Sequence, residues 1–511
     1  MGENKKVARA ATVITFSFGF SKILGFVRDA ALGYFFGASA STDAFLVASS
    51  IPEIIRHFFA GGAVEAGLIP VLSGYSSRND MKSFFITANT VGFLLISILA
   101  VLSIGGIFLS DNLVGLVAPG FHAEKALLTS GLVRIMMPSM IFLSTSCLMS
   151  AVLNSYKHFF TPSITQGVMN FFNIICMFLL VKQGIYSAAV GILIGSFTQI
   201  LIQLPVLIGK KYRFISSLSL RQEGVKKFFI LILPLIFGIS VNQIQIVINR
   251  VLASSLGEGS ISALDFASRI KTIPEMLFGL SVSVAIFPTL SAFSAEGRKA
   301  EFSNTLFKFI KAAFILLIPC TFWCMLLKNE IIGLLFQRGA FTTEATVMTA
   351  SALYYYMTGA FAAAISYILI KACYAEHDTK TPVRIGIIAI AVNIALNLAL
   401  IGPMSYRGLA LATSMASVLQ MLLLLRKFTT IGTALAFLRD TDTLKIAASG
   451  LLSFGATAFC HSLLSGLPFP GLLLKQLCVL AGTFATAYGL MFLLMFLFKV
   501  KHIEKVNIFI K

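Results

Sequence analysis

The feature that most constrains this chain is a series of apolar stretches, each about as long as a helix that crosses a membrane. Such a helix needs about 20 apolar residues to span the hydrocarbon core of a bilayer. The sequence contains fourteen stretches of this kind, and only 12% of its 511 residues are charged. Soluble domains carry about 25% charged residues. The chain is therefore predicted to be an all-α polytopic membrane protein.

The fourteen predicted spans are residues 8–36, 42–74, 83–110, 126–154, 160–182, 186–208, 228–256, 260–294, 303–327, 345–373, 382–402, 407–426, 443–466 and 471–499. The even-numbered connections and both termini hold about 25 Lys and Arg residues, whereas the odd-numbered connections hold about six. Because cytoplasmic loops collect these residues, both termini are predicted to be cytoplasmic. The same bias accounts for the net charge of +19, so we expect no nucleic-acid partner.

An internal repeat divides the predicted spans into two sets of six. Thr161-Pro162 is followed by Asn173, and Thr381-Pro382 is followed by Asn393 at the same spacing, 220 residues later. Six is an even number of spans, so the two copies cross the membrane in the same direction as parallel repeats. We predict a lobe over residues 1–210, a second lobe over 211–430, and a terminal helix pair with a cytoplasmic tail over 431–511.

Charged residues inside the spans are the candidates for function, because each costs about 2.5–3.5 kcal/mol at the bilayer centre. They lie in spans one, two, seven and eight. The five main candidates are Lys22, Arg28, Asp43, Arg56 and Arg269, and four further candidates are Asp29, Glu65, Arg250 and Lys271.

The basic residues among them predict an anion site. The planar guanidinium of Arg presents a fork of donors that fits phosphate oxygens. If the repeat superposes spans two and eight, Arg56 and Arg269 can face one central space, suited to a phosphate or diphosphate. The alternative is a set of intramembrane ion pairs, such as Arg28 with Asp29 and Arg269 with Asp265. Pro52 and Pro274 are expected to interrupt the hydrogen bonding of spans two and eight.

Motifs for several other activities are missing from the sequence. It contains no GxxxxGK[ST] phosphate-binding loop, and no HExxH or GxSxG motif. The seven Cys residues are scattered through apolar stretches without a metal-ligand pattern. These features favour a transporter over an enzyme, with no cofactor or metal. Transport is expected to be driven by the membrane potential or by an ion gradient.

Several motifs carry a resemblance to a known family. They are SKILGFVRDA at 21–30, TDAF at 42–45, Ile51-Pro52 with Arg56, FQRG at 336–339, and TKTPV at 379–383. In these motifs and along nearly its whole length the sequence resembles the MurJ/MviN lipid II flippases. That family lies within the multidrug/oligosaccharidyl-lipid/polysaccharide exporter superfamily. The resemblance implies fourteen helices arranged as two lobes plus a terminal pair, which is held to form a groove for the lipid tail.

The resemblance also implies a cargo and a set of binding residues. The cargo is lipid II, an undecaprenyl-diphosphate that carries a disaccharide-pentapeptide, and it is moved to the outer leaflet. Carried over by position, the cationic residues of the cavity are Lys22, Arg28, Arg56 and Arg269, with Asp43 as an acidic companion. The implied location is the bacterial inner membrane. The implied partners are membrane lipids and the cell-wall synthesis machinery.

The sequence departs from the family pattern at several charged positions. The family's FAEGA stretch is Phe59-Ala60-Gly61-Gly62-Ala63 here, so its acid is missing, and Glu65 is a candidate replacement. Thr272 stands where the family commonly has an acid, and Lys22 stands where Arg is usual. These changes alter the balance of acids and bases expected in the cavity.

Two other functions stay open on the sequence. One is a related exporter of another polyprenyl-diphosphate-linked saccharide or of drugs, although a cavity for cationic drugs should be acidic and aromatic. The other is a scaffold without transport activity, for which Arg56→Ala and Arg269→Ala would leave cells viable.

Overall fold

The computed structural model describes residues 3–60, 62–214, 218–428, 441–466 and 472–498, and every regular element in these ranges is a helix. The chain divides into two compact units. Unit 1 comprises Met1–Ser262 with the short segment Arg338–Phe341, and unit 2 comprises Ala263–Gln337 with Thr342–Lys511. The predicted lobe boundaries at 210 and 430 refer to the sequence repeat and stay predictions.

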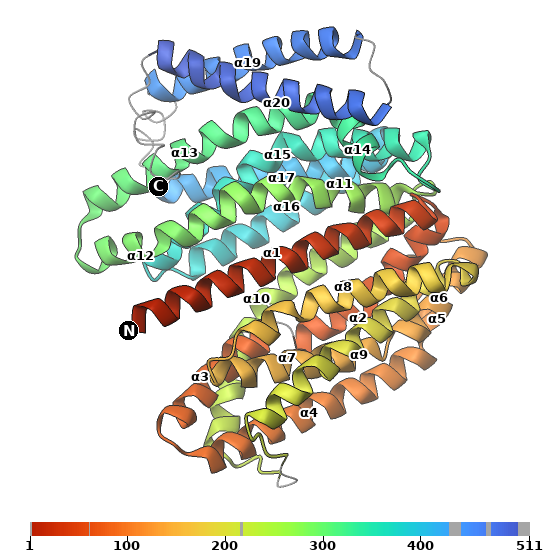
Figure 1. The fold of residues 1–511 in the computed structure, drawn as a ribbon, viewed down its shortest axis with the longest axis vertical. Helices are drawn as coiled ribbons and strands as arrows, with labels where there is room; N and C mark the ends of the chain where they lie inside the picture. The colour runs from red at the N-terminus through yellow and green to blue at the C-terminus, as the bar shows by residue number, and fades with distance from the viewer. Residues whose placement is uncertain (1–2, 61, 215–217, 429–440, 467–471, 499–511) are drawn as a thin grey trace. The chain divides into compact units, whose positions relative to one another are not determined.

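Unit 1 contains the helices of the first half of the chain (Figure 1). They are α1 (Glu3–Phe36), α2 (Ala40–Ala60), α3 (Gly62–Ser77), α4 (Met81–Phe108), α5 (Ser110–Val117), α6 (Ala123–Met136), α7 (Ser139–Ser155), α8 (Phe160–Leu179), η1 (Val181–Gln183), α9 (Tyr186–Gly209) and α10 (Glu223–Ser254). Helix α11 (Ser260–Pro274) begins in unit 1 and continues into unit 2. Within unit 1, α8 packs against both α1 and α9.

Unit 2 contains the remaining helices. They are η2 (Glu275–Leu280), α12 (Ser281–Ala295), α13 (Lys299–Leu326), α14 (Lys328–Phe336), α15 (Thr343–Ala375), α16 (Lys380–Met404), α17 (Tyr406–Phe428), α19 (Thr441–Gly466) and α20 (Leu472–Leu497). Helix α15 packs against α13 and α17, and α19 pairs with α20. Figure 1 shows α19 and α20 running alongside each other.

Eleven helical segments in the described ranges are long and apolar enough to cross a membrane. The other three predicted spans correspond to α1, to α2 with α3, and to α10. The all-helical membrane fold predicted from the sequence is therefore confirmed.

The helix boundaries recur between the two halves of the chain. Helices α8 and α16 begin at Phe160 and Lys380, and helices α9 and α17 begin at Tyr186 and Tyr406. Both pairs are 220 residues apart, the offset found in the sequence. The turns before α8 and α16 also match, because Lys157 and His377 have φ of 59° and 58°. The same backbone unit is therefore built twice.

The interior of each unit is apolar. In unit 1, Leu68, Leu72, Phe84 and Leu99 are fully buried along α3 and α4. In unit 2, a cluster centred on Ile365 and Leu369 of α15 packs against Leu306 and Ile310 of α13. A smaller cluster joins α13 to the terminal pair through Ile315, Ile446 and Met491.

The two prolines behave differently. Helix α2 continues through Pro52 to Ala60. Pro274 ends α11, and the chain then forms the π-helical turn η2 before α12 begins. π-Helical turns are rare and frequently occur at functional sites. The interruption predicted at Pro274 is therefore a change from α-helix to π-helix. At Pro52, in contrast, the chain is α-helical on both sides of the proline.

Candidate substrate-binding site

Arg28 of α1 is held by Asp29 and by Asn170 of α8. Its Nη2 and Nε donate to Asp29 Oδ1 at 2.6 and 3.0 Å, and its Nη1 donates to Asn170 Oδ1 at 3.3 Å. The Arg28 side chain is 21% exposed and that of Asp29 is 6% exposed. The ion pair considered as an alternative is therefore present. A guanidinium has five N–H donors, so these contacts leave Arg28 capacity for a further acceptor.

Arg56 of α2 has a different environment. Its Nη2 lies 3.4 Å from His57 Nε2, and His57 Nδ1 lies 2.8 Å from the backbone oxygen of Glu53. Since Nδ1 faces a carbonyl, it is the protonated nitrogen, and Nε2 accepts from Arg56. The Nε of Arg56 is buried and has no hydrogen-bond partner within the described part of the chain. A buried donor without a partner is costly, and this one favours the arrival of an acceptor.

Glu65, the candidate replacement for the missing family acid, lies in α3 of unit 1. Its Oε1 is 3.7 Å from the Sγ of Cys147 on α7. Helices α3 and α7 therefore bring Glu65 and Cys147 into contact. Gly61, where the family acid is missing, lies outside the described residues, so the replacement of that acid by Glu65 stays a prediction.

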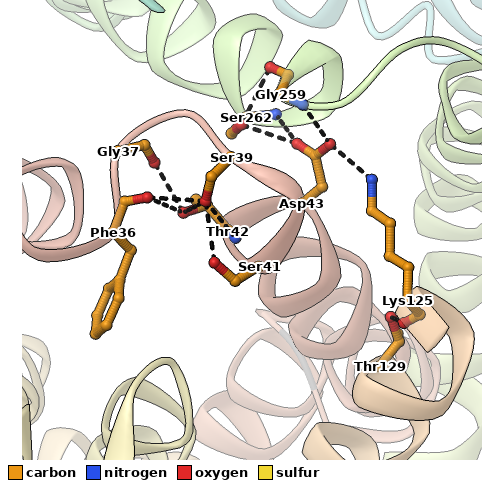
Figure 2. A network of polar contacts seen from close by, with 10 residues as sticks. All are labelled: Phe36, Gly37, Ser39, Ser41, Thr42, Asp43, Lys125, Thr129, Gly259 and Ser262. Carbon is orange, nitrogen blue, oxygen red and sulfur yellow. Dashed lines mark hydrogen bonds and ion pairs between the residues drawn. The ribbon is translucent and has the colours of Figure 1, made fainter. Parts of the chain in front are cut away.

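Asp43 of α2 is the centre of a buried polar network (Figure 2). Its Oδ2 accepts from Lys125 Nζ at 2.9 Å and from the backbone N–H of Gly259 at 2.8 Å. Its Oδ1 accepts from the backbone N–H and the hydroxyl of Ser262, both at 2.8 Å. The Asp43 side chain is 1% exposed. These contacts give Asp43 a structural role, and its role as an acidic companion to the substrate stays a prediction.

In unit 2, the charged residues of α11 and of the start of η2 form pairs one helical turn apart. Arg269 Nε donates to Asp265 Oδ2 at 2.8 Å, and these side chains are 35% and 19% exposed. Lys271 Nζ lies 3.3 Å from Glu275 Oε1 and 5.3 Å from the ring centre of Tyr356. This Lys271–Glu275 contact is an ion pair, although Glu275 Oε1 accepts no hydrogen bond from a described residue. The Arg269–Asp265 pair is the more open to an approaching ligand.

The two other candidates lie on long helices of unit 1. Lys22 is exposed on α1, and Arg250 is half-buried near the end of α10. Unit 1 thus contains Lys22, Arg28 and Arg56, and unit 2 contains Arg269. The central space shared by Arg56 and Arg269 stays a prediction. Among the described residues, no three His, Cys, Asp or Glu side chains gather as a metal site.

Sequence reasoning missed three of the residues that hold the candidates. Lys125 appears in the sequence only as a charge between spans three and four, and Asn170 and Ser262 appear as ordinary polar residues within spans. Each meets its partner through tertiary packing, between 82 and 219 residues away along the chain. The one available signal is that Asn170 is a polar amide inside an apolar span, where it needs a partner.

Comparison with known proteins gives a consistent result. A family model described as "Lipid II flippase MurJ" matches residues 32–469. A probable lipid II flippase MurJ of Buchnera aphidicola subsp. Schizaphis graminum is 34% identical over 411 residues, which cover 79% of this chain and 80% of the relative. The lipid II flippase MurJ of Burkholderia cenocepacia is 31% identical over 415 residues, with coverage of 79% and 80%.

Two solved structures also superpose on most of this chain. A lipid II flippase MurJ in an inward closed conformation superposes with a TM-score of 0.79 and 27% identity, covering 97% of this chain and 99% of the other. An inward-facing multidrug transporter of the MATE family superposes with a TM-score of 0.66, covering 82% of this chain and 96% of the other. At 14% identity, the second likeness concerns the fold alone.

Proposed function

Because this chain belongs to the lipid II flippase MurJ family, we propose that it carries lipid II from the cytoplasmic to the outer leaflet of the membrane. It is a transporter and not an enzyme. It works by alternating access, in which the two lobes open the binding site first to one side of the membrane and then to the other. The membrane is the inner membrane of a bacterium, and both termini lie in the cytoplasm.

The observation that carries this proposal is the environment of Arg56. Its buried Nε has no hydrogen-bond partner among the described residues, and its Nη2 lies 3.4 Å from His57 Nε2. A diphosphate oxygen would give this donor the acceptor that it lacks. A charge-assisted hydrogen bond of this kind is about twice as strong as a neutral one. Arg56 is therefore assigned to the diphosphate.

Arg28 and Arg269 assist Arg56, each from an ion pair that keeps it oriented. Asp29 and Asp265 hold the Nε side of the two guanidiniums, while Arg28 keeps donors for the substrate. Lys22 adds an exposed ammonium on α1. The net charge of the site also depends on three further ionisable residues, Arg250, Lys271 and Glu65. Asp43 acts indirectly, because both of its oxygens are engaged.

The membrane potential supplies the driving force. An anion that leaves a cell with a negative interior moves downhill by about 2.3 kcal/mol per charge per 100 mV. A diphosphate head group can therefore be moved outward without nucleotide hydrolysis. The exported lipid is then used by the cell-wall synthesis machinery, which we propose as a partner.

Depletion of the protein in its native host tests the function. Lipid II is expected to accumulate in the inner leaflet, and re-expression should restore it to the outer leaflet. Accumulation of another polyprenyl-diphosphate-linked saccharide would instead identify the related exporter. A normal leaflet distribution of all such lipids would reject both transport functions and favour the scaffold. The leaflet distribution of lipid II is also measured after re-expression of Arg56→Ala or Arg269→Ala. If transport depends on these arginines, neither variant should restore lipid II to the outer leaflet.

A further inference from the structure

His57 of α2 contacts Arg56, the residue that the proposed function assigns to the diphosphate. We propose that His57 is a positioning residue for substrate binding. Its neutral imidazole orients the guanidinium of Arg56 and leaves the positive charge of that group to the substrate. The inference rests on the proposed function and adds a residue that prepares Arg56 before the diphosphate arrives.

Two hydrogen bonds connect His57 to its own helix and to Arg56. The Nδ1–H of His57 donates to the backbone oxygen of Glu53 at 2.8 Å, and its Nε2 accepts from Arg56 Nη2 at 3.4 Å. Glu53 and His57 are four residues apart, so the ring lies over the preceding helical turn. The carbonyl of Glu53 thus fixes both the position of the ring and its tautomer, because a carbonyl oxygen only accepts. Nε2 is left as the acceptor for Arg56.

The hydrogen-bond acceptor of Arg56 is neutral, unlike those of the other two arginines of the site. One carboxylate lies 2.6 Å from Arg28, and another lies 2.8 Å from Arg269. Within the described ranges, no carboxylate forms an ion pair with Arg56. A carboxylate compensates the charge of the arginine that it orients, whereas a neutral imidazole orients the guanidinium without adding a charge. Arg56 therefore meets the diphosphate without an ion-pair partner of its own.

The contact with His57 also determines which donors of Arg56 remain for a ligand. A guanidinium has five N–H donors in a planar fork. His57 engages Nη2, and the buried Nε keeps a donor that has no partner in the described part of the chain. Ordering a long side chain during binding lowers the affinity about two- to tenfold. An arginine that His57 has already ordered avoids this loss.

Three substitutions of His57 separate its two hydrogen bonds and its lack of charge. His57→Gln has an amide oxygen at about the reach of Nε2, so it can accept from Arg56. His57→Asn has an amide nitrogen at about the position of Nδ1, so it can donate to Glu53 but is too short to reach Arg56. His57→Glu has the length of His57→Gln and adds a negative charge. The control is His122→Asn, because His122 is exposed before α6 and makes no capping hydrogen bond to a described residue.

Binding to the full-length protein in lipid nanodiscs tests the proposal, with undecaprenyl-diphosphate and undecaprenol as probes. His57→Asn should lower the affinity for undecaprenyl-diphosphate about fivefold, and His57→Gln should keep it within about twofold of the wild type. His57→Glu should lower it by at least about tenfold, since its carboxylate compensates the charge of Arg56. His122→Asn should bind as the wild type does. Undecaprenol has no phosphate, so its affinity should be the same in every variant.

A double-mutant cycle shows whether His57 acts through Arg56. Arg56→Lys has no Nη2, so the addition of His57→Asn to this variant should lower the affinity for undecaprenyl-diphosphate no further. The same fivefold loss in both backgrounds would mean that His57 acts independently of Arg56, and it would overturn the positioning role.

The remaining outcomes separate this role from the proposed function. Unchanged affinity in His57→Asn, or equal losses in His57→Asn and His57→Gln, would overturn the role of the acceptor. Equal affinities of His57→Glu and His57→Gln would overturn the need for a neutral one. If Arg56→Ala binds undecaprenyl-diphosphate as the wild type does, the assignment of the diphosphate to Arg56 fails, and the role of His57 fails with it. If Arg56→Ala loses affinity while His57→Asn does not, the assignment of Arg56 stands and His57 has no part in binding.

Discussion

The ammonium of Lys125 lies 2.9 Å from the carboxylate of Asp43, although the two residues are 82 positions apart and belong to α6 and α2. The two side chains are 12% and 1% exposed. Their burial makes each depend on the other, because a charge left alone in a low-dielectric interior is strongly unfavourable. Asp43 also accepts from Gly259 and Ser262, so this one carboxylate connects α2, α6 and the start of α11.

Asp43→Ala should therefore destabilise the protein strongly. The substitution leaves the Lys125 ammonium and two backbone N–H groups without their acceptor, and removal of one partner of a buried pair typically costs about 3–5 kcal/mol. Thermal unfolding in detergent measures the effect. Ser262→Ala removes only one hydroxyl donor and should cost about 1 kcal/mol. Equal unfolding temperatures for Asp43→Ala and the wild type would exclude this structural role.

Arg56→Ala should stop transport while leaving the unfolding temperature nearly unchanged. The Nε of Arg56 has no partner in the described residues, so the folded state loses little when the side chain is removed. Arg56→Lys keeps the charge without the fork of donors, and it should retain a small part of the activity. Flipping of lipid II in reconstituted vesicles is the measurement. Arg298→Ala, in an exposed loop pair, serves as a charge-matched control that should transport normally.

Substitutions of the Arg28 pair should separate binding from folding. Asp29→Asn weakens the hold on the guanidinium at 2.6 Å and makes Arg28 more available, so the affinity for undecaprenyl-diphosphate should be kept or raised. Arg28→Ala removes the cation, and the affinity should fall at least tenfold. Asn170→Ala, which deletes the 3.3 Å contact to Nη1, should have a smaller effect. Equal losses for Arg28→Ala and Asp29→Asn would mean that the pair is only structural.

Acid should weaken the turn between α15 and α16. There Lys427 and the Thr381 side chain and backbone hold the pKa of Asp378 below its ordinary range, with Lys427 Nζ at 2.7 Å. A carboxylate with a lowered pKa stabilises the fold above its unfolded pKa, about 3.9. That contribution is lost as the pH falls from there toward the folded pKa. Asp378→Asn should lower the unfolding temperature at pH 7 and reduce its dependence on acid, whereas Glu258→Gln, in an exposed loop, should do neither.

Gly339→Ala should destabilise unit 1 by more than the conformational cost alone. Gly339 has φ of +61°, and a Cβ at this position would lie 2.3 Å from the backbone oxygen of Tyr34. Gly184 has a similar φ of +60° with open space around it, so Gly184→Ala reports the cost of the backbone conformation, about 1 kcal/mol. Thermal unfolding of both variants gives the difference. If they are equally stable, Tyr34 does not restrict Gly339.

The sequence was sufficient to predict the parts of this fold that depend on local chemistry. Apolar stretches of span length correspond to the helices, because a backbone in lipid must satisfy its own hydrogen bonds. The 220-residue offset between Thr161-Pro162 and Thr381-Pro382 recurs at the starts of α8 and α16. The charged candidates were also visible, because charges are rare in spans.

The partners of those charges could not be predicted in the same way. The pairs Arg28–Asp29 and Arg269–Asp265 are close in sequence, and helical geometry alone suggests them. Lys125 and Asn170 meet their partners only after helices distant in sequence have packed. The availability of Arg56 likewise depends on side chains that surround it and cannot be read from its neighbours along the chain.

The segment Arg338–Phe341 has a practical consequence. These four residues belong to unit 1, although the chain on both sides of them belongs to unit 2, and Ala340 donates a backbone hydrogen bond to Tyr34 at 2.8 Å. A gene cut after residue 262 would yield a first fragment that lacks this piece of its own structure. Separate expression of the two halves should therefore give fragments that recover their native packing only when they are produced together.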